Sequence, residues 1–178
     1  MNWHQAFARQ AASDLHAREV LAADSKLPAC HGLHFLQMAC EKLCKASMMK
    51  AGADPLELQR SHASIAKHLP KIVQHYVSLR NAQLPRKNWI TKALRPLARK
   101  IELLNPAMRD GGSAPENCEY PWAGPNGTIL VPADHSFEFS ILHERAGVML
   151  LKIIQQAAMD LQKETDLPPS PATTPATP

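Results

Sequence analysis

Apolar residues recur at three- and four-residue steps along most of the chain, and this spacing predicts helices rather than strands. The clearest pattern covers residues 28–52, where two apolar faces lie on partly opposite sides of one helix. One face consists of Leu33, Leu36, Cys40, Leu43 and Ser47, and the second of Phe35, Met38, Ala39, Ala46 and Met49. Because a helix that is apolar on two sides is usually buried between neighbours, we expect residues 28–52 to form the central helix of the fold.

A narrow polar row remains on this helix, and it consists of Gln37, Glu41, Lys42 and Lys45. Glu41 precedes Lys45 by four residues, which is the favourable order for an ion pair on an exposed helix surface. Asp24 and Ser25 are candidate caps for the start of the helix, and Gly52 marks its end.

Weaker stripes predict helices on both sides of this segment. Residues 3–23 form the first helix, and the short connection after it predicts an antiparallel pairing with the central helix. Residues 53–60 are expected to form a turn, after which Ser61 caps a third helix. That helix is expected to break at Leu69–Pro70, because proline disrupts a helix interior.

Two further amphipathic helices are predicted at residues 86–104 and 140–163. The residues between them, 105–135, are rich in Gly, Pro and Asn, so we expect a long irregular loop there. Loops of this length inside a domain are often functional or packed as a cover. We expect this loop to wrap over the bundle, held by Tyr120 and Trp122.

The chain ends in a proline-rich stretch, residues 166–178, which has no apolar face and is expected to be disordered. The pattern as a whole predicts an all-α fold with a single domain over residues 1–165. A length of 178 residues suits one such domain. The formal charge of +4 is mild and is not by itself typical of a nucleic-acid-binding protein.

Nothing in the sequence predicts export or a membrane span. The first residues lack the apolar core of a secretory signal, and no run approaches the roughly 18 apolar residues that a span requires. Three of the four cysteines lie on the predicted central helix and suit small buried apolar positions. We therefore expect a reducing, cytoplasmic setting of the bacterial kind.

The cysteines also invite a metal-binding hypothesis. Residues that lie one turn apart on the central helix form two pairs, Cys30 with His34 and Cys40 with Cys44. Zinc takes such ligands in tetrahedral sites. His34 lies about 9 Å along the helix axis from Cys40, so one ion cannot take both pairs. No metal and no other cofactor is predicted, and the alternative is a site completed by Cys118 or His62.

Six basic residues with no acid between them mark the helix predicted at 86–104, namely Arg86, Lys87, Lys92, Arg95, Arg99 and Lys100. Such a stripe contacts phosphate groups through charge rather than by reading bases. The alternative is an ordinary solvated helix face, and Trp89 is the one aromatic residue within the stripe that offers a base-stacking surface.

A family resemblance enters at residues 34–46, which read His-Phe-Leu-Gln-Met-Ala-Cys-Glu-Lys-Leu-Cys-Lys-Ala. This run resembles the second helix of HEPN domains (higher eukaryotes and prokaryotes nucleotide-binding), which commonly reads as an aromatic residue or His, then Gln-x-Ala-x-Glu-Lys-x-x-Lys-Ala. The segment Asp14-Leu15-His16-Ala17 and the pair Ser61-His62 are similar to the flanks of that helix. Residues 117–122 resemble the extension of an uncharacterised bacterial subset of HEPN-like proteins.

The resemblance implies an antiparallel bundle of four to five helices that is often dimeric. Many members are metal-independent ribonucleases whose motif is Arg, four to six residues, then His, usually near the last helix. No His follows Arg145, and His143 stands before it in reversed order. Arg9 and His16 match the spacing, with six residues between them, but lie in the first predicted helix.

We therefore expect a non-catalytic, HEPN-like binding or partner module, homodimeric, associated with RNA, a nucleotide or a companion protein such as a nucleotidyltransferase. The alternative is a divergent metal-independent ribonuclease of the toxin or defence type. Its candidate catalytic residues are Arg9, His16, His143 and Arg145.

Overall fold

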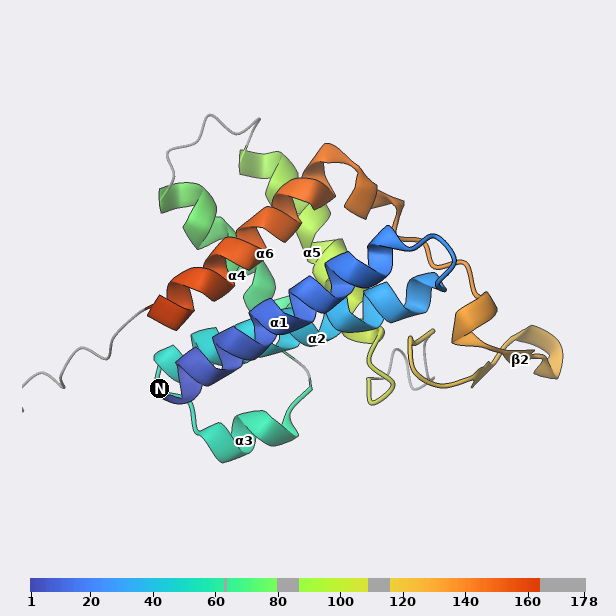
Figure 1. Ribbon diagram of the computed structural model, residues 1–178, viewed down its shortest axis with the longest axis horizontal. Coiled ribbons are helices and arrows are strands. Elements are labelled where there is room, and N and C mark those ends of the chain that lie inside the picture. The colour runs from blue at the N-terminus through green and yellow to red at the C-terminus, as the bar shows by residue number, and fades with distance from the viewer. Residues whose placement is uncertain (63, 80–86, 109–115, 164–178) are drawn as a thin grey trace, which may run out of the picture.

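Helices dominate the computed structural model, which describes residues 1–62, 64–79, 87–108 and 116–163, with the side chains of 87–92 excepted (Figure 1). The helices are α1 (Trp3–Ala23), α2 (Ala29–Lys50), α3 (Pro55–Arg60), α4 (Ile65–Leu79), α5 (Lys87–Leu103) and α6 (Arg145–Lys163). The predicted all-α helical bundle is confirmed. The prediction of a disordered tail over residues 166–178 lies outside the described residues, as does Arg86.

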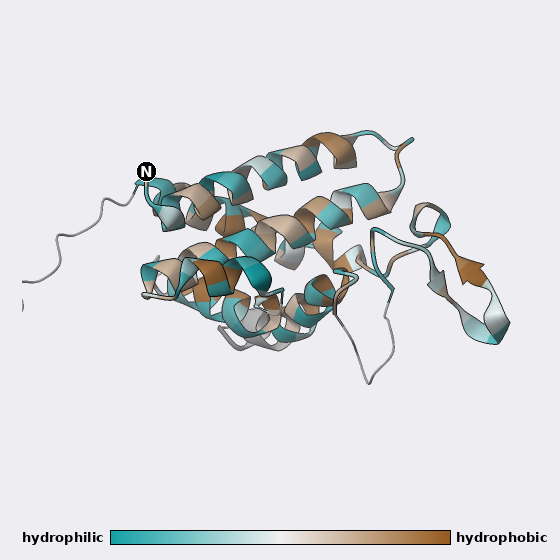
Figure 2. Ribbon diagram, turned by 90° about the horizontal axis from the view of Figure 1, so that it is seen from below, coloured by the Kyte–Doolittle hydropathy of each residue, from teal (hydrophilic) through white to brown (hydrophobic). Residues whose placement is uncertain are grey.

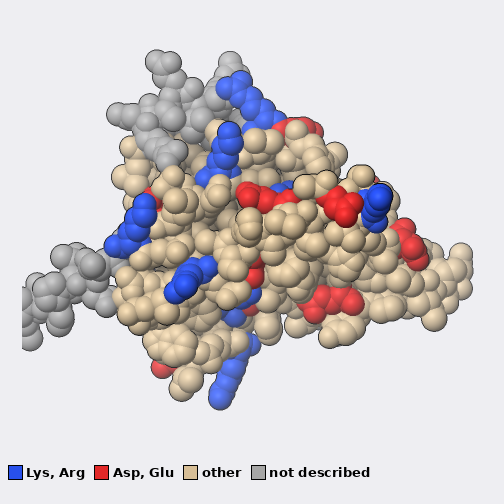
Figure 3. Space-filling view, viewed as in Figure 1, with Lys and Arg blue, Asp and Glu red and all other residues tan. Residues whose placement is uncertain are grey.

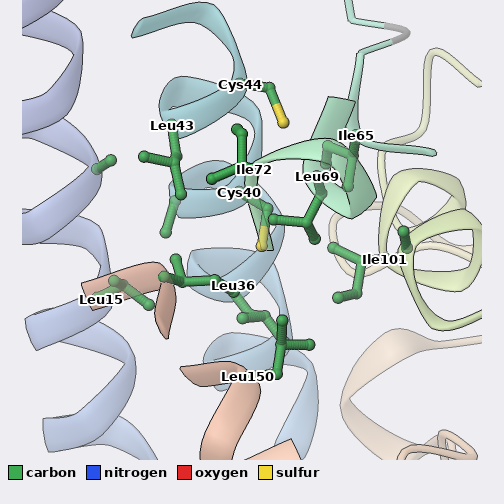
Figure 4. Packing of buried hydrophobic residues seen from close by; sticks show 14 of the residues in the cluster. Leu15, Leu36, Cys40, Leu43, Cys44, Ile65, Leu69, Ile72, Ile101 and Leu150 are labelled. Atoms are coloured by element: carbon green, nitrogen blue, oxygen red, sulfur yellow. The ribbon is translucent and has the colours of Figure 1, made fainter. Parts of the chain in front are cut away.

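Helix α2 is central, as its two apolar faces predicted. It packs along α1 as an antiparallel hairpin and also contacts α4, α5 and α6. Figure 4 shows Leu36 and Leu43 of α2 directed toward α1, while Cys40 lies among Leu69 of α4 and Ile101 of α5. All five side chains are fully buried. At about 25 cal/mol per Å² of apolar surface removed from water, this core supplies the main favourable contribution to folding.

The ends of the first two helices are fixed in different ways. Asn2 and Gln5 form a reciprocal capping box at the start of α1, with both hydrogen bonds at 3.0 Å. The expected caps of α2 are wrong: Pro28 is its N-cap residue and no side chain caps that end. The Asp24 carboxylate instead accepts the Lys26 amide at 2.9 Å within the turn between the helices.

The predicted turn at 53–60 is in fact the short helix α3. Asp54 caps it, because its Oδ1 accepts the amides of Leu56 at 2.7 Å and Glu57 at 3.1 Å, and Pro55 occupies the first helical position. Ser61 ends α3 rather than capping the next helix. The Asp-Pro pair before Leu-Glu-Leu is the sequence signal for this helix.

The predicted break at Leu69–Pro70 is also wrong, because α4 runs through Pro70 without interruption. Proline removes one backbone hydrogen bond at this point. The residues around it, Leu69, Ile72 and Val73, are buried against the neighbouring helices. Burial of these side chains outweighs the lost bond, so packing rather than local propensity sets the length of α4.

The segment before α6 is irregular, as predicted, and part of it lies against the bundle, where Cys118 belongs to the core. Strands β1 (Trp122–Ala123) and β2 (Ile129–Leu130) form a small antiparallel hairpin that projects from one end of the bundle (Figures 1 and 2). Trp122 is buried beside the rings of His135 and Phe137. The side chain of Tyr120 is 61% exposed, so its predicted role in holding the loop is wrong.

Helix α6 begins five residues later than predicted, after the 3-10 turn η3 (Ser140–His143). Gly147 explains how this turn packs against the helix. A Cβ atom at this position would lie 2.2 Å from the carbonyl oxygen of Ile141 and 2.4 Å from the Cα of Leu142. Glycine therefore permits η3 to lie directly on the first turn of α6.

Candidate functional site

The four predicted catalytic candidates are all exposed. Arg9 and His16 lie on the same side of α1, two turns apart. His143 ends η3 and Arg145 begins α6. Of the two histidines, His143 lines a cavity, and the arginine that lines the same cavity is Arg18 rather than Arg145.

The predicted basic stripe on α5 is partly neutralised where its side chains are described. Arg99 pairs with Glu102 at 2.9 Å, and Lys100 lies 3.7 Å from Glu138. Arg95 is exposed and makes no ion pair with a described residue. On the face drawn in Figure 3, Lys and Arg side chains stand singly, with Asp and Glu side chains among them. Phosphate contact by this stripe stays a prediction.

The polar row of α2 is largely buried, in keeping with the interior position predicted for this helix. Gln37 is 1%, Glu41 6% and Lys45 5% exposed. The Lys45 ammonium donates to Glu41 Oε1 at 2.6 Å, and the Gln37 amide donates to Oε2 at 2.9 Å. An ion pair buried in this way is stabilising only when further hydrogen bonds satisfy the carboxylate.

Two residues from other segments complete this buried network. Asn105, which follows α5, donates to Glu41 Oε2 at 3.4 Å, and the half-exposed His62, which precedes α4, has its Nδ1 3.4 Å from Glu41 Oε1. The Glu41 carboxylate therefore links α2 to the segment that precedes α4 and to the segment that follows α5. Because each contact of Glu41 is with another protein group, we assign the network to the stability of the fold.

The residues that carry the HEPN resemblance are the residues of these polar contacts. Besides Gln37, Glu41 and Lys45, the motif lysine Lys42 pairs at 2.5 Å with the buried Asp14 of α1. The flanking His62 belongs to the network as well. The motif thus corresponds to a set of paired polar groups between helices.

A second buried glutamate fixes the start of α4. Glu102 Oε1 accepts the Ala66 amide at 3.1 Å, so a side chain of α5 satisfies one of the free amides at the helix N-terminus. Its Oε2 accepts the guanidinium of Arg99. The hydroxyl of Ser64, which is buried just before α4, has no hydrogen-bond partner in the described part of the chain. Glu102 therefore takes the capping role that a serine usually has.

A different arrangement of charge occurs in a cavity of about 250 Å³ between α2, α4 and the end of α6. We call it the basic pocket, and its polar lining consists of Ser47, Lys50, His68, Lys71, His75 and Tyr76. Apolar side chains of Ile72 and Leu161 also line it, and in the part of the chain that the structure describes no aspartate or glutamate does so.

The folding of α4 explains how the basic pocket forms. His68, Lys71 and His75 are spaced by three and four residues, so they share one side of the helix. The buried face of α4, which includes Leu69 and Val73, packs toward α2 and α5. The side with His68, Lys71 and His75 therefore lies beside the C-terminal end of α2.

The electrostatics of the pocket favour an anion. Burial lowers the pKa of His68, and the neighbouring Lys67 and Lys71 lower it further. These effects oppose protonation because the surroundings are both poorly solvated and positive. A bound anion would offset the lowering of the His68 pKa by the two lysines. It would also accept hydrogen bonds from the lysine, imidazole and hydroxyl donors. The arrangement is therefore suited to binding and has no assembled nucleophile and base.

The cysteines are all free and buried, as their apolar positions predicted. Burial raises the pKa of Cys40 to about 12 and also raises those of Cys30, Cys44 and Cys118. Thiols in such surroundings are weak nucleophiles and weak metal ligands. Within the described ranges, no group of three or more His, Cys, Asp or Glu residues is placed to hold a metal ion.

Among the described helices, none combines the length and the apolar character that crossing a membrane requires. Comparison of the chain with models of known families, with curated proteins and with solved structures found no match. The HEPN resemblance therefore rests on the residues quoted above.

Proposed function

We propose that this chain is a non-catalytic, HEPN-like helical module that binds the phosphate group of a nucleotide or of an RNA. The observation that carries the proposal is the basic pocket, where His68, Lys71 and His75 converge with Ser47 and no described acidic residue lines the cavity. In the buried network of Glu41, by contrast, each cation has its counter-charge inside the protein.

The chemistry of the lining matches a phosphate group. The ammonium of Lys71 is a strongly hydrated point charge with three donors, and each neutral imidazole adds one N–H donor. Charge-assisted hydrogen bonds of this kind are roughly twice as strong as neutral ones. A cavity of about 250 Å³ is smaller than the usual drug-sized site, so it suits a phosphate and part of its sugar rather than a duplex groove.

The basic stripe of α5 is a secondary contact in this proposal. Arg95 is exposed and makes no ion pair with a described residue, so it is available for a second phosphate of the same strand. A single-stranded RNA that reaches both sites would bind more tightly than a mononucleotide. The difference in affinity between a single-stranded RNA and a mononucleotide therefore shows which of the two is the ligand.

Fluorescence anisotropy with a labelled single-stranded RNA tests the proposal, with unlabelled adenosine monophosphate as competitor. We expect Lys71→Gln to weaken RNA binding about tenfold, since one charge-assisted contact is lost. Lys152→Gln, a matched change at an exposed lysine of α6, should have little effect. Arg95→Gln should cause a smaller loss than Lys71→Gln.

The salt dependence gives an independent readout. Loss of one phosphate contact should reduce the slope of log affinity against log salt by about one. Equal affinities and equal slopes for the wild type and Lys71→Gln would contradict the proposal. If adenosine monophosphate displaces the RNA completely and Arg95→Gln does not change the RNA affinity, the ligand of the pocket is a nucleotide rather than RNA.

A protein partner is the second role that we propose, and the projecting hairpin supports it. The side chains of Tyr120, Ile129 and Val131 are 61%, 76% and 41% exposed. Exposed apolar groups on one projecting element are typical of interaction surfaces. Light scattering of the wild type and of Ile129→Ser would test whether this hairpin joins two copies, the predicted homodimer, and a monomeric wild type would leave a companion protein as its partner.

The competing ribonuclease hypothesis has a direct assay. Metal-free RNA cleavage by the wild type is compared with His16→Ala and His143→Ala. We expect that neither His16→Ala nor His143→Ala reduces any cleavage observed with the wild type. Cleavage abolished by either change would replace the binding role with an enzymatic one.

A further inference from the structure

A second cavity, of about 400 Å³, lies at the opposite end of α2 from the basic pocket. It is lined by the turn that joins α1 to α2 and by residues 137–143, which lead into α6. Figure 1 shows these two segments at the same end of the bundle. Gly32 lines this cavity and Lys50 lines the basic pocket, and these residues are separated by about 27 Å along the helix. We call this second cavity the Arg18 cavity.

Arg18 is the one cation of the lining that is charged at all relevant pH values. It is half-buried, and burial lowers the pKa of its guanidinium. Arg18 makes no hydrogen bond and no close ion pair with any described residue, although a guanidinium carries five donors, and the adjacent Glu19 carboxylate only partly offsets the effect of burial on its pKa. Half-buried arginines usually pair with an acceptor, since an unpaired charge out of water is costly. The group is therefore available to a ligand.

The walls of the Arg18 cavity are mainly apolar. Leu21 and Leu33 come from α1 and α2, and the aromatic rings of Phe137 and Phe139 come from the segment before η3. Phe139 is only 9% exposed, so its ring is held in place. A cavity with apolar walls and a few convergent polar groups is the usual form of a small-molecule site.

We infer that the Arg18 cavity binds a small organic carboxylate, with the carboxylate on the Arg18 guanidinium and an apolar body against Phe137 and Phe139. A planar guanidinium matches a carboxylate through two parallel hydrogen bonds. A monoanion suits a single fixed cation, whereas a phosphate dianion would leave charge unpaired between apolar walls.

Two other charged groups of the lining modify this picture. Asp24 is exposed, and its Oδ1 is already engaged by the Lys26 amide at 2.9 Å. The exposed His143 adds positive charge when it is protonated. The inference does not depend on the phosphate-binding proposal, because no residue lines both cavities.

Amide NMR titration of the full chain tests this inference with phenylacetate as the probe and phenylacetamide as its neutral isostere. Phenylacetate should shift the amides of Gly32, Ser25 and His143 and bind about tenfold more tightly than phenylacetamide, because only the anion forms the charge-assisted contact. This arm needs no substitution, so it does not depend on the folding of a variant.

The matched variants are Arg18→Gln and Arg9→Gln, both on α1. Arg18→Gln should abolish the preference for the anion, while Arg9→Gln, an exposed arginine away from the cavity, should keep it. Equal binding of the two probes to the wild type, shifts confined to other regions, or no saturable shift would each overturn the inference.

Discussion

Two rows of polar residues on neighbouring helices have similar spacing and opposite surroundings. On α2, Gln37, Glu41 and Lys45 are buried and bonded to one another. On α4, His68, Lys71 and His75 line a cavity with no acidic residue among the described residues of its lining. The two rows differ in the presence of a counter-charge, which the spacing of residues along a helix does not reveal.

This difference separates structural polar groups from available ones. A buried charge whose partners are all protein groups stabilises one arrangement of the helices and has no remaining capacity for a ligand. Cations that converge without an acid leave an electrostatic potential that an external anion can neutralise. The predictions below test this distinction, beginning with the largest expected effect.

Glu41→Ala should cause the largest loss of stability, about 3 to 5 kcal/mol, because it leaves Lys45 buried without its carboxylate. Urea unfolding followed by circular dichroism measures it. The matched control is Glu19→Ala at an exposed position of α1, which should change the free energy of unfolding by no more than about 0.5 kcal/mol. Similar values for the two variants would show that the network contributes little.

Glu102→Ala should cost about 1 to 3 kcal/mol, because the Ala66 amide and the Arg99 guanidinium both lose their acceptor. Glu138→Ala is the control, since Glu138 is almost fully exposed and its contact with Lys100 is 3.7 Å long. If Glu102→Ala unfolded at the same urea concentration as the control, the assignment of Glu102 as the cap of α4 would be wrong.

The fold was largely predictable because helices leave a periodic signal. The segment 3–23 became α1 with the same bounds, and 28–52 became α2 with one residue fewer at its start and two fewer at its end. The prediction failed where tertiary contacts decide the outcome. Burial carries α4 through Pro70, and a local cap forms α3 in a stretch that looked like a turn.

The sites were less predictable, for a related reason. Spacing on α4 places His68, Lys71 and His75 on one side, but the approach of Ser47 from α2 is a tertiary fact. Likewise, no local pattern indicates that His62 and Asn105 reach Glu41. The sequence therefore predicts the Glu41–Lys45 pair on α2 but not its partners from other segments, and it does not predict the convergence of the α4 row with Ser47.

The pH dependence of binding is expected to be a smaller effect. Burial, Lys67 and Lys71 lower the pKa of His68 when no ligand is bound, so this imidazole is protonated less readily in the folded chain than in the unfolded chain. The free energy of unfolding therefore decreases as the pH falls through the unfolded-state pKa. A phosphate in the pocket raises this pKa. Affinity should therefore rise as the pH falls from about 8 to about 6, by a few-fold.

The control for this prediction is His68→Gln, measured with the same ligand so that titration of the phosphate itself cancels. The other charged groups that face His68 are Lys50 of α2 and Lys71 and His75 of α4. The pH dependence of the variant should be flatter than that of the wild type. Identical slopes would remove His68 from the site.

Ser64→Ala should have the smallest effect. The Ser64 hydroxyl is buried and has no hydrogen-bond partner among the described groups, so its removal should leave the free energy of unfolding unchanged or raise it by up to about 1 kcal/mol. Thermal unfolding measures this. A loss of stability above that amount would mean that the hydroxyl has a partner after all.

Amide NMR mapping with inorganic phosphate is the most direct test of the central claim, namely that the α4 row has no counter-charge among the described residues of its cavity and therefore binds an anion. We predict saturable shifts at Ser47, His68, Lys71 and His75 in the wild type, weakened about tenfold in Lys71→Gln without a change in unfolding. Shifts confined to α5, or shifts of equal strength in Lys71→Gln, would contradict it.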